Sequence, residues 1–288
     1  MVLFTPEKKQ FEIGQSVGTY ISHNTASSPK SAEKLSQHYL NVSSFINTNN
    51  LESFDIVSKE VVIKDLSTIG AYIITQRLIL SENAGLHLEF TLPQGFHLNT
   101  FCRVNRIEKI SELNCVYGYG VQFCGLNDMN IDFLNYYLNL LENGQGSIVE
   151  HGRITLCYEV TTLDNNQLFI SILGSLHPLE SEDLEATVGR ALAKLATGPI
   201  LVFIDASVIG ANSRASLEFI HNWLERLRHN RQVFGVMVGH ESIGFVQFRR
   251  LAREAGIADS LISFTEHANA VSFWGTLIGN AGYLSTVA

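Results

Sequence analysis

The chain has 288 residues, of which 45% are hydrophobic, and its formal net charge is −8. At roughly 150 residues per domain, this length predicts two domains with conventional apolar cores. The acidic balance argues against a nucleic-acid-binding protein, because such proteins present a basic surface to the phosphates. No stretch approaches the roughly 18 uninterrupted apolar residues of a membrane-spanning helix, and the first residues lack the pattern of a secretion signal.

The cysteines and histidines give no sign of a metal site or of catalysis. The four cysteines stand singly, without a Cys-x-x-Cys pair. The histidines of the second half that the sequence singles out are scattered without ligand spacing: His177, His221, His229, His240 and His267. We therefore expect buried, reduced thiols and a cytoplasmic location. The sequence predicts no catalytic residue, no metal, no bound cofactor and no enzymatic activity.

Residues 1–56 are predicted to form an N-terminal extension. The segment from 27 to 50 is rich in Ser and Asn, and a short amphipathic helix fits residues 31–45. A first barrel strand over residues 10–13, a docking arm and a tail all remain open as roles for this extension.

The most informative motif is Asp65-Leu66-Ser67-Thr68-Ile69-Gly70, which lies between two apolar strand patterns, 61–64 and 71–74. Asp and Ser side chains at a strand end either bond neighbouring backbone amides or present acceptors to a ligand. Gly70 is expected to supply backbone freedom at a tight corner. The motif therefore predicts a β-corner that is able to bind a ligand.

Alternating apolar segments continue after this corner, at residues 85–93, 98–107 and 117–123. Asn127 is then expected to cap a helix whose apolar residues recur at helical spacing as far as Leu141. Residues 57–142 are therefore predicted to form a small antiparallel β-barrel with a C-terminal helix.

This region resembles a PilZ domain, the bacterial receptor module for cyclic di-GMP. The resemblance rests on Asp65, Ser67 and Gly70, on the strand order, and on the closing Gly-Tyr-Gly-Val-Gln-Phe strand. It implies that these three residues are candidates for binding cyclic di-GMP. However, PilZ domains that bind this ligand resemble one another in an upstream Arg-x-x-x-Arg motif, and this chain has no arginine before Arg77. Lys30 and Lys34 have that spacing but lack the planar fork of a guanidinium, and Arg249 and Arg253 lie in the other half of the chain.

The run from Glu142 to Ser147 is short, polar and contains glycine, which predicts a linker over residues 143–152. Residues 153–288 are predicted to form an α/β domain with a mixed sheet. Helical patterns alternate with apolar strand patterns at 153–158, 168–172, 200–205 and 233–238.

The second half resembles a STAS domain, the fold of anti-sigma-factor antagonists. The likeness rests on Asp205-Ala206-Ser207, on Asn212-Ser213-Arg214-Ala215 at the start of the second helix, and on Gly174-Ser175-Leu176. In such antagonists the matching serine is phosphorylated by a partner kinase. The resemblance therefore implies Ser213 as a phosphorylation candidate, with Asn212 and Arg214 beside it on a partner surface.

The simpler interpretation is that Ser213 or Asn212 caps the helix. Ser213 can both cap the helix and be phosphorylated. Ser207 and Ser216 are rival serines for the phosphate. A phosphate at residue 213 would lie near exposed amides and the positive end of the helix.

Three functions compete. In the first, the chain is a signalling adaptor in cyclic di-GMP-related regulation that binds a protein partner, such as a kinase or an anti-sigma-like regulator, through its STAS-like part. In the second, the barrel is a true cyclic di-GMP receptor whose cations come from the N-terminal extension or a second subunit. In the third, the STAS-like part binds a small nucleotide or lipid. The oligomeric state, including a homo-oligomer, is left open.

Overall fold

The computed structural model describes residues 58–76, 78, 80–111, 115–163, 166–230 and 232–284. The expectations for residues 1–56, including those for Lys30 and Lys34, lie outside the described residues. Within the described residues, no helix combines the length and the apolar character that crossing a membrane requires.

The first part of the chain is a closed antiparallel barrel of six strands, in the order β1-β2-β5-β4-β3-β6, with β6 pairing back onto β1. The predicted antiparallel barrel is therefore confirmed. Its strands are β1 (Lys59–Leu66), β2 (Gly70–Gln76), β3 (Gly85–Thr91), β4 (His97–Ser111), β5 (Val116–Phe123) and β6 (His151–Leu163). Apolar side chains alternate along these strands because one face of each strand fills the barrel interior.

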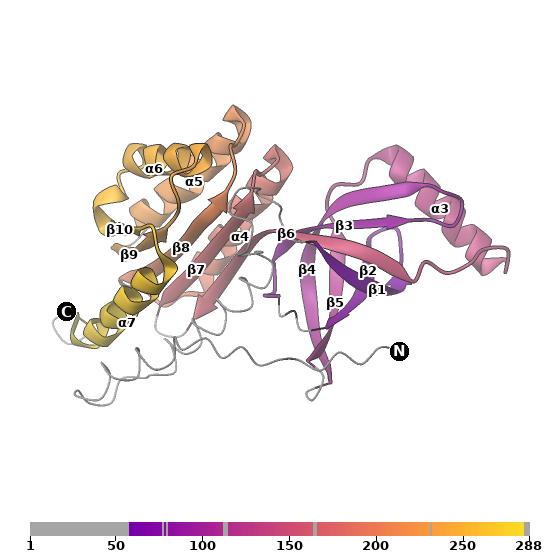
Figure 1. Ribbon diagram of the computed structural model, residues 1–288, viewed down its shortest axis with the longest axis horizontal. Helices are drawn as coiled ribbons and strands as arrows, with labels where there is room; N and C mark the ends of the chain where they lie inside the picture. Colours follow the sequence, from indigo (N-terminus) through magenta and orange to yellow (C-terminus); the bar gives the residue numbers. More distant parts are fainter. Residues whose placement is uncertain are drawn as a thin grey trace.

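Helix α3 (Asp128–Glu142) follows β5 and projects at the far end of the barrel (Figure 1). Asn127 caps it as predicted, because its side chain accepts a hydrogen bond from the amide of Asn130. The buried Leu134 and Tyr137 face the barrel. The Tyr137 hydroxyl also donates to the Ser147 carbonyl at 2.8 Å and accepts from the Val149 amide, so it fixes the chain that leads to β6.

The sheet continues from β6 into the second part as β7 (Gln167–Gly174), β8 (Ile200–Ile209), β9 (Val233–Val238) and β10 (Leu261–Phe264). Strand β6 pairs antiparallel with β7, whereas the pairs β7–β8, β8–β9 and β9–β10 are parallel, so this sheet is mixed. Four helices accompany these strands: α4 (Pro178–Lys194), α5 (Arg214–Asn230), α6 (Ile243–Glu254) and α7 (His267–Leu284), and a short 3₁₀ turn, η1 (Ala258–Ser260), precedes β10.

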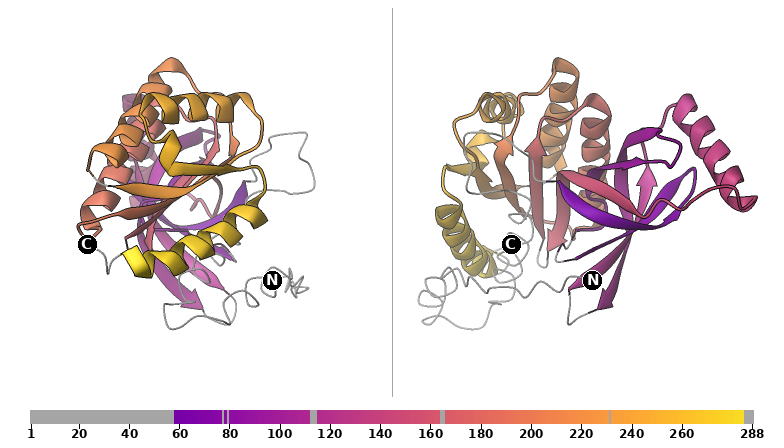
Figure 2. Two further views of the ribbon diagram at one scale, coloured as in Figure 1. Left: turned by 90° about the vertical axis from the view of Figure 1, so that its left-hand side faces the viewer. Right: turned by 45° about the vertical axis from the view of Figure 1, so that its right-hand side comes forward.

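The helices cover both faces of the mixed sheet, with α4, α5 and α6 on one face and α7 on the other (Figure 2). Alternate residues of β8 therefore enter different cores. Val202 and Ile204 pack under α4, α5 and α6, whereas Phe203 packs edge-on against Trp274 of α7 at 5.5 Å between ring centroids.

The barrel and the mixed sheet share strand β6. Residues 151–158 of β6 pair with β1 and β3, and residues 158–163 pair with β7. The end of the predicted linker, His151 and Gly152, thus belongs to a barrel strand. The predicted domain boundaries 57–142, 143–152 and 153–288 stay predictions, because one hydrogen-bonded sheet runs through both parts.

Gly70→Ala is expected to destabilise the protein by about 1–3 kcal/mol, because the added Cβ would overlap the carbonyl oxygen of Val121 on the paired strand β5. The matched control is Gly189→Ala in α4, where the new Cβ meets only the Arg226 guanidinium at 3.4 Å. That change should be neutral or should stabilise the helix by up to about 1 kcal/mol. Denaturant unfolding measures both, and equal unfolding free energies for wild type and Gly70→Ala would contradict the close approach.

Candidate functional site

The corner between β1 and β2 forms one wall of an open hollow of about 490 Å³ on the barrel surface. Asp65, Ser67 and Gly70 all line it, so the structure brings the three predicted ligand residues together. The opposite wall is formed by β4 and β5 and includes Asn105 and Arg106.

Ser67 uses its hydroxyl to hold the corner in shape. Its Oγ donates to the Gly70 carbonyl at 3.1 Å and accepts from the amides of Ile69 and Gly70 at 3.3 and 3.2 Å. Asp65 is exposed, and its Oδ1 accepts from the Leu66 amide at 2.9 Å. The Ser67 hydroxyl therefore serves the shape of the corner, and Asp65 and Ile69 are the side chains of the motif that are exposed to solvent.

Gly70 is needed for a reason other than the predicted one. Its φ lies outside the left-handed region, so backbone freedom is not what the corner requires of it. A glycine is required because β5 approaches too closely for a Cβ. This is a correction to the sequence interpretation.

Glycines of β5 also make room for the side chains that border the hollow. A Cβ at Gly118 would overlap the Tyr72 ring, and one at Gly120 would meet the Cβ of Arg106 at 3.3 Å. Arg106 is 72% exposed and lies 3.2 Å from Glu108, which also accepts from the Tyr72 hydroxyl at 3.0 Å. Among the described residues that line this hollow, Arg106 carries the one positive charge. Arg249 and Arg253 lie on α6, at the other end of the molecule (Figure 1).

Ser213 caps helix α5 and remains exposed. Its Oγ accepts from the Ser216 amide at 3.2 Å, which is the bond expected of an N-cap serine. The rival serines are both buried. Ser216 is fully buried and donates to the Leu176 carbonyl, and Ser207 is 3% exposed and donates to Asp205. Of these three serines, only Ser213 is therefore accessible to a kinase.

Asn212 points inward and is only 7% exposed. Its Oδ1 accepts from the Leu176 amide and its Nδ2 donates to the Gly210 carbonyl, both at 2.8 Å. Its backbone amide and carbonyl bond the side chain of Gln247 on α6. Of the three residues of the predicted partner surface, Ser213 and Arg214 are exposed, whereas Asn212 is buried and fixes their position, and the partner surface itself stays a prediction.

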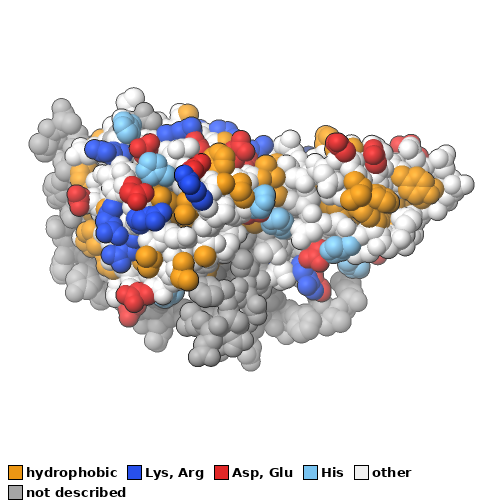
Figure 3. Space-filling model, turned by 90° about the horizontal axis from the view of Figure 1, so that it is seen from above, with side chains coloured by type: hydrophobic (Ala, Val, Ile, Leu, Met, Phe, Trp, Pro, Cys, Tyr) orange, Lys and Arg blue, Asp and Glu red, His pale blue; other side chains and the backbone are white. Residues whose placement is uncertain are grey.

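Helix α6 lies next to this helix start, because Gln247 bonds the backbone of Asn212, and α6 carries exposed apolar and basic side chains. Ile243 and Val246 of α6 are 73% and 58% exposed, although large aliphatic side chains are usually buried. Figure 3 shows Lys and Arg side chains gathered over the α/β half of the molecule. We define the α5–α6 face as Ser213, Arg214, Ile243, Val246, Arg249, Arg250 and Arg253, all of which are exposed.

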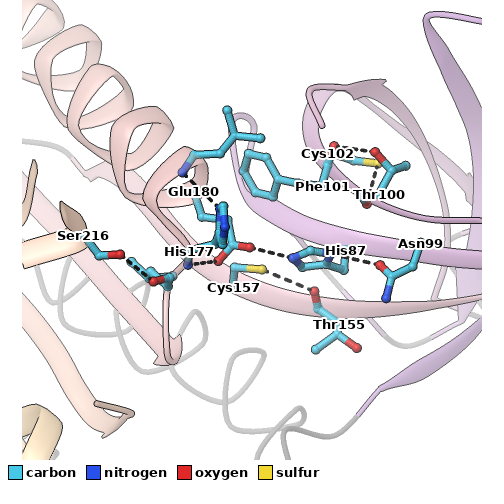
Figure 4. Close-up of polar contacts among 12 residues, drawn as sticks. His87, Asn99, Thr100, Phe101, Cys102, Thr155, Cys157, His177, Glu180 and Ser216 are labelled. Carbon is cyan, nitrogen blue, oxygen red and sulfur yellow. Dashed lines mark hydrogen bonds and ion pairs between the residues drawn. The ribbon is translucent and has the colours of Figure 1, made fainter. Parts of the chain in front are cut away.

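Where the barrel meets α4, a polar cluster joins β3, β6 and α4 (Figure 4). His87 Nε2 lies 2.7 Å from Glu180 Oε1, and His87 Nδ1 lies 3.0 Å from Asn99 Oδ1. The hydrogen bond to Glu180 raises the pKa of His87 despite its partial burial. Burial raises the pKa of the nearby Cys157 thiol well above its usual value. The residues of this cluster are far apart in the sequence, so sequence reasoning missed it. The one local signal is the segment His177-Pro178-Leu179-Glu180, which is typical of a helix start with a capping box.

A second set of contacts in the same junction involves Asp183 of α4. Arg103 of β4 donates to Asp183 at 2.7 Å, and the Tyr158 hydroxyl donates to the other carboxylate oxygen. Both partners of the ion pair are largely buried, so the pair orients α4 against the barrel.

The α/β part has its own open hollow of about 690 Å³ beside the end of α4, lined by residues that include Leu192, Pro199 and Arg226. Arg226 pairs with Glu185 at 2.6 Å. The small nucleotide or lipid expected for this part stays a prediction.

Asp205 of β8 is 2% exposed and forms a third polar cluster with Ser207 and His267. Its Oδ1 accepts from the Ser207 hydroxyl at 2.6 Å and the Ser207 amide at 3.0 Å, and His267 Nε2 lies 3.4 Å away. Burial alone raises the pKa of Asp205, but His267 and the Ser207 donors outweigh burial and lower that pKa below its usual value of 3.8.

Asp205→Asn is expected to lower the free energy of unfolding by about 1–3 kcal/mol near pH 6. Because the folded-state pKa is depressed, the stabilising contribution is present above pH 3.8 and is lost as the pH falls through the folded-state value. The gap between wild type and variant should therefore shrink below about pH 4. Denaturant titrations from pH 6 to 3 test this, and a gap that stays constant would contradict it.

No family model matches the chain, and no curated protein matches it. Among solved structures, an uncharacterised protein with a SpoIIAA-like fold from Shewanella loihica has 15% identity and a TM-score of 0.31 over 41% of this chain and 91% of its own. An anti-sigma factor antagonist from Mycobacterium paratuberculosis has 16% identity and a TM-score of 0.29 over 40% and 92%. The cytochrome b5 reductase domain of Ulva prolifera nitrate reductase has 8% identity and a TM-score of 0.23 over 72% and 97%. TM-scores of this size do not establish a shared fold, so the function is argued from the geometry of the chain itself.

Proposed function

We propose that the chain is a non-enzymatic signalling adaptor that binds a protein partner through the α5–α6 face, with phosphorylation of Ser213 as the switch. The observation that carries this proposal is the exposure of Ser213 at the N-terminus of α5, next to α6, whose first turn exposes aliphatic side chains and whose later turns expose arginines. Apolar centres with arginine are typical of protein–protein interfaces.

The charges of this face favour an acidic partner surface. Arg249, Arg250 and Arg253 are all exposed on α6, and the first turn of α5 contains no acidic residue. A phosphate on Ser213 would add about two negative charges at the positive end of α5, where the helix tolerates them. The same charges would repel an acidic partner, so phosphorylation would release it.

The arrangement around Asp205 supports a role without catalysis. A hydrolytic triad needs a serine whose hydroxyl faces the histidine. Here the Ser207 hydroxyl is buried and donates to Asp205 instead of His267.

The second candidate function is reception of cyclic di-GMP in the hollow beside the β1–β2 corner, which would place the adaptor under control of this dinucleotide. One observation favours it: Arg106 borders the same hollow as Asp65, Ser67 and Gly70, although it lies on β4 and not in an upstream motif. A guanidinium can pair with a phosphate bidentately and stack on a base.

Ser213→Asp is expected to weaken binding of the co-purifying partner at least tenfold, because it adds a negative charge to the face. Ser213→Asn is the matched control, since Asn caps a helix about as well as Ser but carries no charge. Pull-down and titration with the purified partner measure the difference, and mass spectrometry after incubation with cell lysate and ATP reports phosphate at residue 213. Equal partner affinity for both variants would contradict the switch.

If the hollow binds the dinucleotide, calorimetry should give saturable micromolar binding of cyclic di-GMP. Arg106→Ala should then weaken that binding at least tenfold, because it removes the cation of the hollow. Arg253→Ala on α6 is the control and should leave the affinity unchanged. The absence of saturable heat with wild-type protein would eliminate this candidate and leave the adaptor proposal standing.

A further inference from the structure

We propose that His87, Cys157 and Glu180 bind a divalent transition-metal ion, for which zinc has the fitting chemistry, where the barrel meets α4. The three residues come from β3, β6 and α4, and one ligand atom from each lies within 4.8 Å of the other two. Figure 4 shows the three side chains converging between the barrel strands and the start of α4. This site is independent of both the α5–α6 face and the hollow at the β1–β2 corner.

The hydrogen bonds of His87 leave its second nitrogen facing a carboxylate, which calls for either a proton or a metal ion between them. Asn99 Oδ1 is an acceptor, so the Nδ1 that lies 3.0 Å from it carries a proton and donates. In the neutral imidazole, Nε2 then presents its lone pair to Glu180 Oε1, only 2.7 Å away. Two acceptors at this distance need either a proton or a metal ion between them.

The spacing of the cluster suits a metal after small side-chain movements. Tetrahedral zinc, with bonds of about 2.0–2.3 Å, holds its ligand atoms about 3.3–3.6 Å apart. The His87–Glu180 pair at 2.7 Å must therefore widen by about 0.6–0.9 Å, and the longest separation, which is within 4.8 Å, must close by at most about 1.5 Å. Rotation of the Cys157 and Glu180 side chains supplies movements of this size.

Outer hydrogen bonds already orient two of the three ligands. Asn99 holds the His87 ring with Nε2 toward the cluster, and the His177 amide donates to Glu180 Oε2 at 2.9 Å, which leaves Oε1 to face His87. Metal-binding histidines and carboxylates ordinarily have such supporting partners. The backbone amide of His87 also hydrogen-bonds the Cys157 sulfur, but burial outweighs this bond and raises the pKa of the thiol, so the incoming metal ion must displace the thiol proton.

Burial and donor type point to zinc with one position left for water. Glu180 and Cys157 are 5% and 6% exposed, whereas the His87 side chain is 34% exposed. The solvent side of His87 thus offers both an entry path and a fourth coordination position. One thiolate, one imidazole and one carboxylate form a mixed donor set that zinc accepts and that magnesium and calcium do not favour.

The test uses the full chain carrying Cys115→Ser, because Cys115 is an exposed thiol outside the cluster. The chelator-treated protein is titrated with Co²⁺ and then with Zn²⁺. We expect saturation at one ion per chain, a near-ultraviolet sulfur-to-cobalt charge-transfer band, and displacement of Co²⁺ by Zn²⁺. Cys157→Ser should remove the band, and Cys124→Ser, which alters a half-buried thiol outside the cluster, should retain it.

Glu180→Gln keeps the experiment decisive if Cys157→Ser does not fold. The Gln side-chain oxygen still accepts from the His177 amide, so the cap of α4 survives while the carboxylate ligand is lost. Affinity for Co²⁺ should fall at least tenfold in this variant. Absence of a charge-transfer band in the folded starting protein, or equal affinity in Glu180→Gln, would overturn the metal site and leave a protonated His87–Glu180 pair.

Discussion

Strand β6 takes part in two hydrogen-bonded systems, and the placement of every candidate site depends on this. Its first residues close the barrel against β1 and β3, and its last residues open the mixed sheet with β7. Tyr158 stands at the changeover, paired with both Gly85 and Ile172. A side chain at residue 85 would overlap the Tyr158 ring, so the glycine there allows the two systems to meet. The hydroxyl of Tyr158 then reaches Asp183 and ties α4 to the junction.

The exposed start of α5 is held by buried polar groups. The Asn212 side chain hydrogen-bonds the Leu176 amide and the Gly210 carbonyl, and its backbone hydrogen-bonds the side chain of Gln247 on α6. Each of these bonds satisfies a group that would otherwise be buried without a partner. Ser213 is therefore presented at a fixed place beside α6 even though its own side chain is exposed. A modification at this residue changes the surface charge without needing the core to move.

Much of the fold follows from periodicity in the sequence. Alternation of apolar residues marks β1 to β5, continuous apolar runs mark β7 to β9, and Asn127 caps its helix as expected. Strand β10 has only four residues, two of them exposed, so it carries too little apolar pattern to be recognised. The double role of β6 also has no local signature, because strand pairing is decided by distant partners.

The candidate sites were predictable to different degrees. Asp65, Ser67, Gly70 and Ser213 belong to short motifs whose geometry is local, so their neighbourhoods could be anticipated. Arg106 joins the corner only because β4 crosses the barrel beside β5. His87, Cys157 and Glu180 come from three separate elements, and only the closure of the barrel onto α4 brings them together. Ligands that come from separate elements have no characteristic spacing, so the sequence alone does not predict this cluster.

Because β6 belongs to both the barrel and the mixed sheet, the chain cannot be cut into two fragments without breaking strand pairing. A fragment that ends at residue 142 would lack β6, the sixth strand of the barrel, and would leave β1 and β3 as edge strands with unpaired backbone amides and carbonyls. A fragment that begins at residue 153 would keep the pairing of β6 with β7 but would lose β1 and β3 beside residues 153–158, which would expose apolar side chains of β6 such as Ile154 and Leu156. Each fragment would therefore lose strand pairing that the intact chain supplies through β6.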